Sequence, residues 1–200
     1  MIPKPAIDGL MLLQNKVFPD ERGFFVERFH ELRFREHGLY TSFIQDNHSR
    51  SVPGVIRGLH YQYNPPQGKL VGVIRGRILD VAVDLRPESP TYGQHEGIEL
   101  SDENGLMLWI PPGFAHGFCV LGHEPADVLY KVDGVWNAAC EGGILWNDQD
   151  LNIAWPVENP IVSGKDQQLP AFASYRENPI DWNRYIKQGQ ASAGLPNYTR

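Results

Sequence analysis

The chain has 200 residues, of which 42% are hydrophobic, 21% are charged, 20 are glycine and 16 are proline. This composition allows a sizeable buried core and excludes a disordered or low-complexity chain. The formal net charge of −6 argues against a nonspecific nucleic-acid binder, which carries a basic surface, but is compatible with a small anionic ligand held by a few local arginines and lysines.

The N-terminal sequence MIPKPAIDGL has no basic segment followed by a long apolar stretch, so no signal peptide is predicted. No window approaches the roughly 18 consecutive apolar residues of a membrane span. The two cysteines, Cys119 and Cys140, cannot form a disulfide framework, and Cys119 is expected to be buried because it lies in an apolar run. We therefore expect a cytoplasmic protein that does not bind membranes.

The first part of the chain contains a charged turn and a helix signal. The sequence DERG at 20–23 precedes an aromatic segment, which predicts a turn whose Arg22 is either a surface cation or a bidentate phosphate ligand. Residues 27–37 predict a short helix that ends at Gly38.

Polar residues are densest in the segments 45–51 and 54–62. On a strand, His60 and Gln62 point to the same side as Gly58. A cupin metal site uses a closely spaced HxH pair, and Gln62 interrupts that pattern. His60 therefore has two interpretations, a hydrogen-bonded structural histidine or a general base in the mouth of a barrel.

Two strands are predicted at 69–74 and 78–85. Because they flank Arg75-Gly76-Arg77, they predict a tight hairpin. In the second strand the apolar residues Leu79, Val81, Val83 and Leu85 alternate with other side chains and would share one face.

A strand at 106–110 ends at Pro111-Pro112-Gly113. The pattern PxGxxH, which spans residues 111–116, matches the second half of the cupin signature and delivers His116 at the start of the next strand. This histidine either binds nearby backbone or faces a site. His60 and His116, with no glutamate on the expected strand, make a poor ligand set, so no metal is predicted.

The strand at 128–132 places Tyr130 on the same face as Val128 and Val132, either as a core aromatic or as a proton donor. Strands recur at a spacing of roughly 10 residues, which predicts an all-β sandwich or barrel rather than alternating βα units. Near the C-terminus, Trp182 and Tyr185 predict a short helix that docks on the body. A loose tail is expected from Ala191 onward.

Taken together, these motifs resemble the dTDP-4-dehydrorhamnose 3,5-epimerase family. The resemblance covers about residues 1–172 and leaves 173–200 outside it as a C-terminal extension. It implies a cupin-type jelly roll with a few short helices, a homodimer that exchanges N-terminal strands, and no metal or redox cofactor. The matching motifs, in order, are DERGFFVERF (20–29), QDNHS (45–49), VIRGLHYQ (55–62), QGKLV (67–71), DVAVDLR (80–86), SPTYG (89–93), PPGFAHGF (111–118), LYK (129–131), ILWND (144–148) and SGKD (163–166).

The family's substrate, a nucleotide-linked 4-keto-6-deoxyhexose, explains the residue types. Its ketone acidifies the hydrogens on carbons 3 and 5, so a base can remove one of them and form an enolate. A donor on the other face then returns a proton, and a nearby positive charge stabilises the enolate. No cofactor is required because the ketone accepts the electron pair.

Carried over by motif, His60 resembles the base, Asp166 its carboxylate partner, Tyr130 the acid and Lys69 the group that stabilises the enolate oxygen. Arg57 and His116 match sugar and phosphate contacts, Gln45, Asn47, Glu141 and Lys165 match further substrate-binding positions, and Phe18, Arg22 and Glu27 match nucleotide contacts that can come from across the dimer interface.

One position departs from the family pattern. The family has two tyrosines five and six residues after the acid, where this chain has Val135 and Trp136. Trp136 is either a larger stacking platform for the nucleobase or a core residue. The change leaves open whether the bound base is thymine, cytosine or a purine, so a CDP- or GDP-linked sugar is an alternative substrate. Because relatives that epimerise a single carbon have nearly the same polar residues, it is also open whether C3, C5 or both are epimerised.

Two other classes compete with an epimerase: a cupin-fold binder of sugar nucleotides and a metal-dependent cupin oxygenase. A binder needs neither an acid nor a base, so His60 and Tyr130 together favour the enzyme. The absence of an HxH pair argues against the oxygenase.

Overall fold

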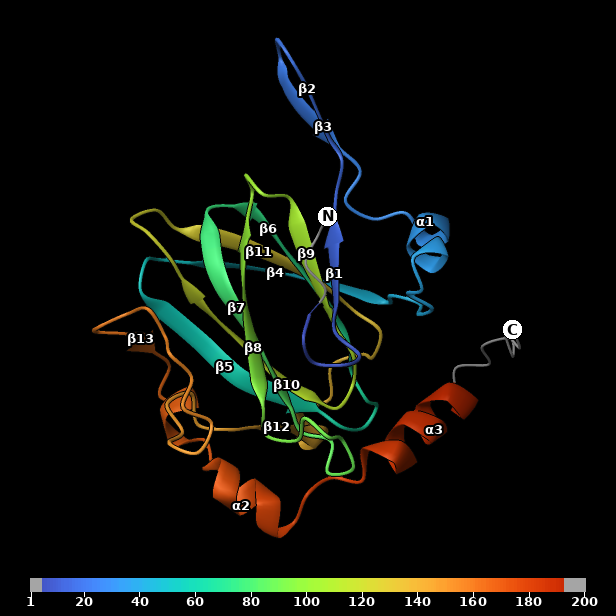
Figure 1. Cartoon of the computed structure of the whole chain (residues 1–200), viewed down its shortest axis with the longest axis vertical. Helices are drawn as coiled ribbons and strands as arrows, with labels where there is room; N and C mark the ends of the chain where they lie inside the picture. Colours follow the sequence, from blue (N-terminus) through green and yellow to red (C-terminus); the bar gives the residue numbers. More distant parts are fainter. Residues whose placement is uncertain (1–4, 193–200) are drawn as a thin grey trace.

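Two β-sheets pack face to face in the computed structural model, which describes residues 5–192, the side chains of 190–192 excepted (Figure 1). The first sheet has the order β1-β9-β6-β11-β4, formed by Met11–Gln14, Leu106–Ile110, Lys69–Arg75, Ala126–Val132 and Gln45–Ser51. The second has the order β12-β5-β10-β7-β8, formed by Glu141–Gly143, Val55–Gln62, Phe114–Val120, Arg77–Asp84 and His95–Ser101. Strand β13, Ile161–Val162, pairs in parallel with β5. The predicted all-β sandwich is confirmed.

Strand β7 is buried on both faces. Val81 and Val83 belong to an outer cluster that the C-terminal helices cover. Ile78 and Ala82 belong to the core between the sheets. The predicted shared face is therefore confirmed, and the opposite face of the strand, which also carries Asp80, points into the sandwich.

The predicted hairpin at 75–77 is wrong, because β6 and β7 lie in different sheets. Both edges of each strand are occupied by other partners: β6 pairs with β9 and β11, and β7 with β8 and β10. Gly76 makes the crossing with φ +79°, and a Cβ there would meet Pro125 O at 2.6 Å, so the corner requires glycine.

Helix α1 spans Glu31–Glu36, a shorter segment than the predicted 27–37. It begins after His30, whose side chain accepts a hydrogen bond from Arg33 N. Gly38, with φ +91°, follows its end as expected. Before the helix, β2 (Val17–Asp20) and β3 (Gly23–Val26) form a two-stranded hairpin that projects from the sandwich (Figure 1).

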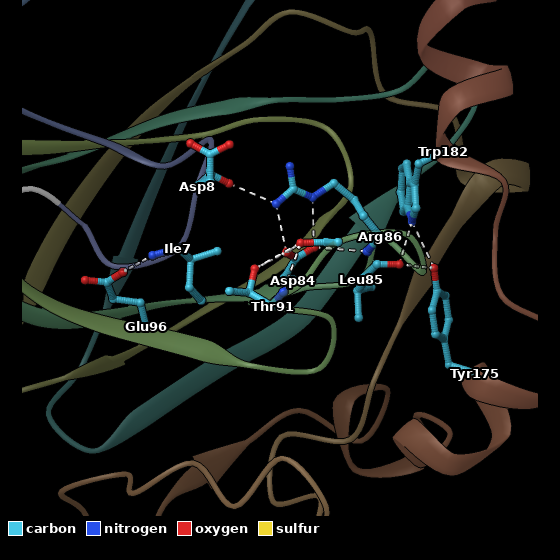
Figure 2. Close-up of polar contacts among 10 residues, drawn as sticks. Ile7, Asp8, Asp84, Leu85, Arg86, Thr91, Glu96, Tyr175 and Trp182 are labelled. Atoms are coloured by element: carbon cyan, nitrogen blue, oxygen red, sulfur yellow. Dashed lines mark hydrogen bonds and ion pairs between the residues drawn. The ribbon is translucent and has the colours of Figure 1, made fainter.

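The C-terminal helices α2 (Phe172–Glu177) and α3 (Trp182–Ser192) lie against the outside of the second sheet. Trp182 is 2% exposed, and its indole N–H donates to Leu85 O at 3.1 Å and to Tyr175 Oη at 2.9 Å (Figure 2). The Tyr61 and Trp182 rings pack in a T-shaped arrangement, with their centroids 5.9 Å apart. The predicted docking helix is confirmed, whereas most of the predicted tail lies outside the described residues.

We expect Trp182→Ala to lower the free energy of unfolding by ~3–5 kcal/mol, because it removes a large buried aromatic and two hydrogen bonds. Urea unfolding followed by circular dichroism measures the change. The control is Tyr40→Ala, at a side chain 67% exposed, which should change stability by less than about 0.5 kcal/mol. A Trp182→Ala loss as small as the control's would show that α3 contributes little to the fold.

Among the described residues, no helix is both long enough and apolar enough to cross a bilayer.

Candidate active site

A cavity of about 740 Å³ opens between the two sheets, and strands from both sheets line it. Its walls bring together residues that are far apart in the sequence, with Gln45 and Asp166 separated by 121 positions. The predicted site residues that line it are Gln45, Asn47, Arg57, His60, Lys69, His116, Tyr130, Trp136, Glu141, Lys165 and Asp166.

His60 and Asp166 form a hydrogen-bonded pair in the second sheet's wall. Strand β5 carries His60, and the short 3₁₀ helix η2 (Asp166–Gln168) carries Asp166. His60 Nε2 lies 2.7 Å from Asp166 Oδ1, and Gly58 N donates to Oδ2 at 3.3 Å. Burial acts to raise the pKa of Asp166, but these hydrogen bonds outweigh it and hold the pKa below its ordinary value. The carboxylate therefore stays charged and orients an imidazole that is 28% exposed.

A second histidine–carboxylate pair, which the sequence analysis missed, lies beside the first. His116 on β10 is the register partner of His60 on β5. Its Nε2 lies 2.6 Å from Oδ1 of the fully buried Asp80, whose Oδ2 has no hydrogen-bond partner among the described residues. The sequence signal for Asp80 was its position between Leu79 and Val81 in a strand, which places its side chain on the opposite face from theirs.

Lys69 and Tyr130 come from the first sheet and face the cavity from the opposite wall, on β6 and β11. Burial lowers the pKa of Lys69 to about 8, against the opposing effect of Glu141 and Asp80. Burial also raises the pKa of Tyr130, so its phenol keeps its proton at neutral pH. Both therefore have the charge states that an enolate stabiliser and a proton donor need.

Because Lys69 loses its charge near pH 8, we expect kcat/KM to fall as the pH rises through about 8. Below that pH the ammonium is present and can stabilise negative charge on the substrate. Lys69→Arg keeps the charge to much higher pH, so it should move this basic limb upward. Profiles of kcat/KM from about pH 6 to 10 measure the shift, and an unmoved limb in Lys69→Arg would assign it to another group.

The outer part of the cavity is lined by an aromatic ring and an ion pair. Trp136 is 61% exposed, so the alternative that it is a core residue is wrong. Lys165 Nζ lies 2.6 Å from Glu141 Oε2. Arg57 Nε donates to Ser51 Oγ at 2.9 Å, which orients the guanidinium beside the cavity.

Three predicted nucleotide contacts do not line this cavity. Phe18 and Arg22 lie on the projecting β2–β3 hairpin (Figure 1), where Arg22 pairs with Asp20 at 2.6 Å. Glu27 follows the hairpin and pairs with Arg33 at 2.6 Å. Within one chain these residues therefore stand apart from the site.

In the part of the chain that the structure describes, no three His, Cys, Asp or Glu side chains are grouped so that they could hold a metal ion.

Comparison with known proteins decides the family. A family model described as dTDP-4-dehydrorhamnose 3,5-epimerase matches residues 4–174. The chain belongs to the dTDP-4-dehydrorhamnose 3,5-epimerase family. Membership confirms the expected cupin-type fold and the expected enzyme class, an isomerase.

Individual relatives, found by sequence and by structure, support the same family assignment. The dTDP-4-dehydrorhamnose 3,5-epimerase of Shigella flexneri is 52% identical over 165 residues, which are 82% of this chain and 91% of that protein. The Bacillus anthracis epimerase, solved with TDP and pyrophosphate bound, has a TM-score of 0.82 and 46% identity, over 86% of this chain and 98% of that one. The 3′-monoepimerase ChmJ of Streptomyces bikiniensis, solved with dTDP-quinovose, has a TM-score of 0.85 and 29% identity, over 95% and 98%.

Proposed function

We propose that this chain epimerises dTDP-4-dehydro-6-deoxyglucose at C3 and C5 to give dTDP-4-dehydrorhamnose. The observation that carries the proposal is the placement of a base and an acid on opposite walls of one cavity. His60, with Asp166 at 2.7 Å, comes from one sheet, and Tyr130 comes from the other.

In the proposed first step, His60 removes the hydrogen from C3 or C5. Because Nε2 is bound to Asp166, Nδ1 is the nitrogen that accepts the proton. The C–H bond breaks and its electron pair moves onto the ketone oxygen, where the Lys69 ammonium stabilises the enolate. Asp166 then stabilises the imidazolium that has formed.

In the proposed second step, Tyr130 donates its phenolic proton to the opposite face of the same carbon. The enolate's electron pair forms the new C–H bond and the ketone is restored with inverted configuration. His60 then releases its proton to solvent and the Tyr130 phenolate takes one up. The enzyme is thereby restored, and the proposed cycle needs neither a redox cofactor nor a metal.

The remaining cavity residues are proposed to bind the sugar and the nucleotide. Trp136 offers its exposed face to the nucleobase. A homodimer that exchanges N-terminal strands would bring nucleotide contacts from the partner subunit. The exposed aromatics of the projecting hairpin, Phe24 at 61% and Phe25 at 68%, support such an interface. The proposed binding residues are Arg57, His116, Gln45, Asn47, Glu141, Lys165 and Trp136, with Phe18, Arg22 and Glu27 contributed across the dimer.

Turnover of dTDP-, CDP- and GDP-linked 4-keto-6-deoxy sugars in deuterated water tests the proposal. We expect the dTDP sugar to be preferred and to gain deuterium at both C3 and C5 with inversion. Exchange and inversion at C3 alone would instead make the chain a monoepimerase like ChmJ, whose structure is similar over most of the chain. Binding without exchange at either carbon would contradict an epimerase altogether.

Turnover is expected to persist in the presence of a strong chelator, because the substrate's own ketone accepts the electron pair. The rate after prolonged dialysis against chelator, compared with a sample dialysed against buffer, measures this. Loss of activity that one added divalent metal restores would contradict the proposal and make His60 and His116 metal ligands.

A further inference from the structure

The loop at residues 134–137, which follows β11 (the 134–137 loop), is held by the side chains of glutamines that lie outside it. Gln67 Nε2 donates to Gly134 O at 2.6 Å. Gln62 Nε2 donates to Val135 O at 2.9 Å, and Gln62 Oε1 accepts from Asn137 N at 2.7 Å. The backbone of the loop is therefore fixed on both sides of Trp136.

A third glutamine contacts Trp136 itself. Gln45 Oε1 accepts a hydrogen bond from Trp136 N at 3.3 Å. Although its backbone is held by these hydrogen bonds, Trp136 is 61% exposed and lines the cavity. With the main chain held, only the two side-chain torsions of Trp136 remain to be ordered when a ligand binds.

Gln62 makes more of these contacts than the other two glutamines. Besides its two bonds to the loop, its Nε2 donates to Pro65 O at 2.8 Å, and it is 3% exposed. It thus connects the 134–137 loop to the turn that precedes β6. It stands two residues after His60, and the proposed proton transfers leave this buried amide without a chemical role.

The loop also lies directly against that turn. A Cβ placed on Gly134 would meet Pro66 O at 2.7 Å, so even alanine at this position would push the two segments apart. The position of the loop is therefore set both by glutamine hydrogen bonds and by backbone contact.

We propose that Gln62, together with Gln67 and Gln45, is a positioning residue that holds Trp136 in place as a stacking platform for the nucleobase and thereby sets nucleotide affinity. The inference rests on the stacking role of Trp136 in the proposed function. Its physical basis is preorganisation: a platform that is ordered before binding loses less conformational entropy when the base arrives.

Two variants displace the loop by independent means. Gln62→Met removes its hydrogen bonds at similar side-chain length, and Gly134→Ala acts by steric contact alone. We expect each to weaken dTDP binding about fivefold or more, with raised KM and nearly unchanged kcat. The affinity for inorganic pyrophosphate should not change, since it has no base. Isothermal titration calorimetry measures both affinities.

The matched control is Asn104→Leu, away from the cavity. The Asn104 amide also makes three backbone hydrogen bonds, with Ser101 N, Leu106 N and Glu99 O. We expect this variant and Gln62→Met both to lose thermal stability, but only Asn104→Leu to keep wild-type affinity for dTDP. A general loss of stability is thereby separated from displacement of the platform.

Combination with Trp136→Ala is the decisive measurement. Trp136→Ala alone should weaken dTDP binding about 5- to 150-fold, and adding Gln62→Met or Gly134→Ala should then change it no further. Unchanged dTDP affinity in both loop variants, or losses that add fully to that of Trp136→Ala, would overturn the inference. An unaffected Trp136→Ala would overturn the stacking role on which it rests, while the deuterium experiment tests the epimerase reaction separately.

Discussion

Replacement of His60 with asparagine is expected to lower the rate of deuterium incorporation at C3 and C5 by ~10²–10⁴-fold, the usual contribution of a general base. Asparagine can still form a hydrogen bond to Asp166 but cannot accept a proton from carbon. NMR spectra of the substrate in deuterated water measure exchange directly. The binding of dTDP should stay within about tenfold of wild type, because the nucleotide is held by other residues.

The companion variant Asp166→Asn should have a smaller effect, since the imidazole remains. Asparagine loses the negative charge that stabilises the imidazolium and can present its N–H to His60 in place of the acceptor oxygen.

If His60→Asn retains near-wild-type exchange, His60 is a structural histidine and the proposed base is wrong.

Replacement of Tyr130 with phenylalanine is expected to reduce inverted product by about 10²-fold or more while exchange of the abstracted hydrogen continues. The phenyl ring keeps the packing of Tyr130 against the core between the sheets, but the proton that returns to the opposite face is gone. Enolate formation survives, because His60 and Lys69 remain. Proton abstraction and proton return are therefore separated in one variant.

Two readouts of the same reaction distinguish these outcomes: deuterium content of recovered substrate and the amount of inverted product. Parallel loss of both in Tyr130→Phe would indicate disruption of the site rather than removal of the acid. Full inversion would show that Tyr130 only lines the cavity and that water or another donor serves that face. The raised pKa of Tyr130 favours the donor role at neutral pH.

The local pattern of the chain predicted much of the architecture. Alternation at Leu79, Val81, Val83 and Leu85 placed them on one face, because side chains of a strand alternate by geometry alone. The apolar pattern around Trp182 likewise predicted a docked helix. The helix at Glu31–Glu36 was predicted too long, since its start depends on a weak cap at His30 that follows no usual sequence signal.

Motifs also predicted most residues of the cavity. The segments RGLHYQ and PPGFAHGF together indicated His60 and His116, although the spacing of two histidines in the sequence could not show that they are neighbours on β5 and β10. Asp80 was missed because a carboxylate on a strand is ordinarily exposed. Asp80 is buried beside His116 only because the two sheets, each formed by strands distant in the chain, pack face to face over it.

By itself, the sequence determined the strand-rich class and the shared faces of its strands, since these follow from local geometry. The candidate reactive side chains came from the resemblance of its motifs to the family. The tertiary structure decided that β6 and β7 separate into different sheets, that Asp166 meets His60, that Trp136 stands exposed at the cavity, and that Phe18 and Arg22 lie apart from it in one chain. These features depend on pairing between strands that are distant in the chain and on the side-chain packing that this pairing produces. No local sequence pattern specifies which strands pair with each other.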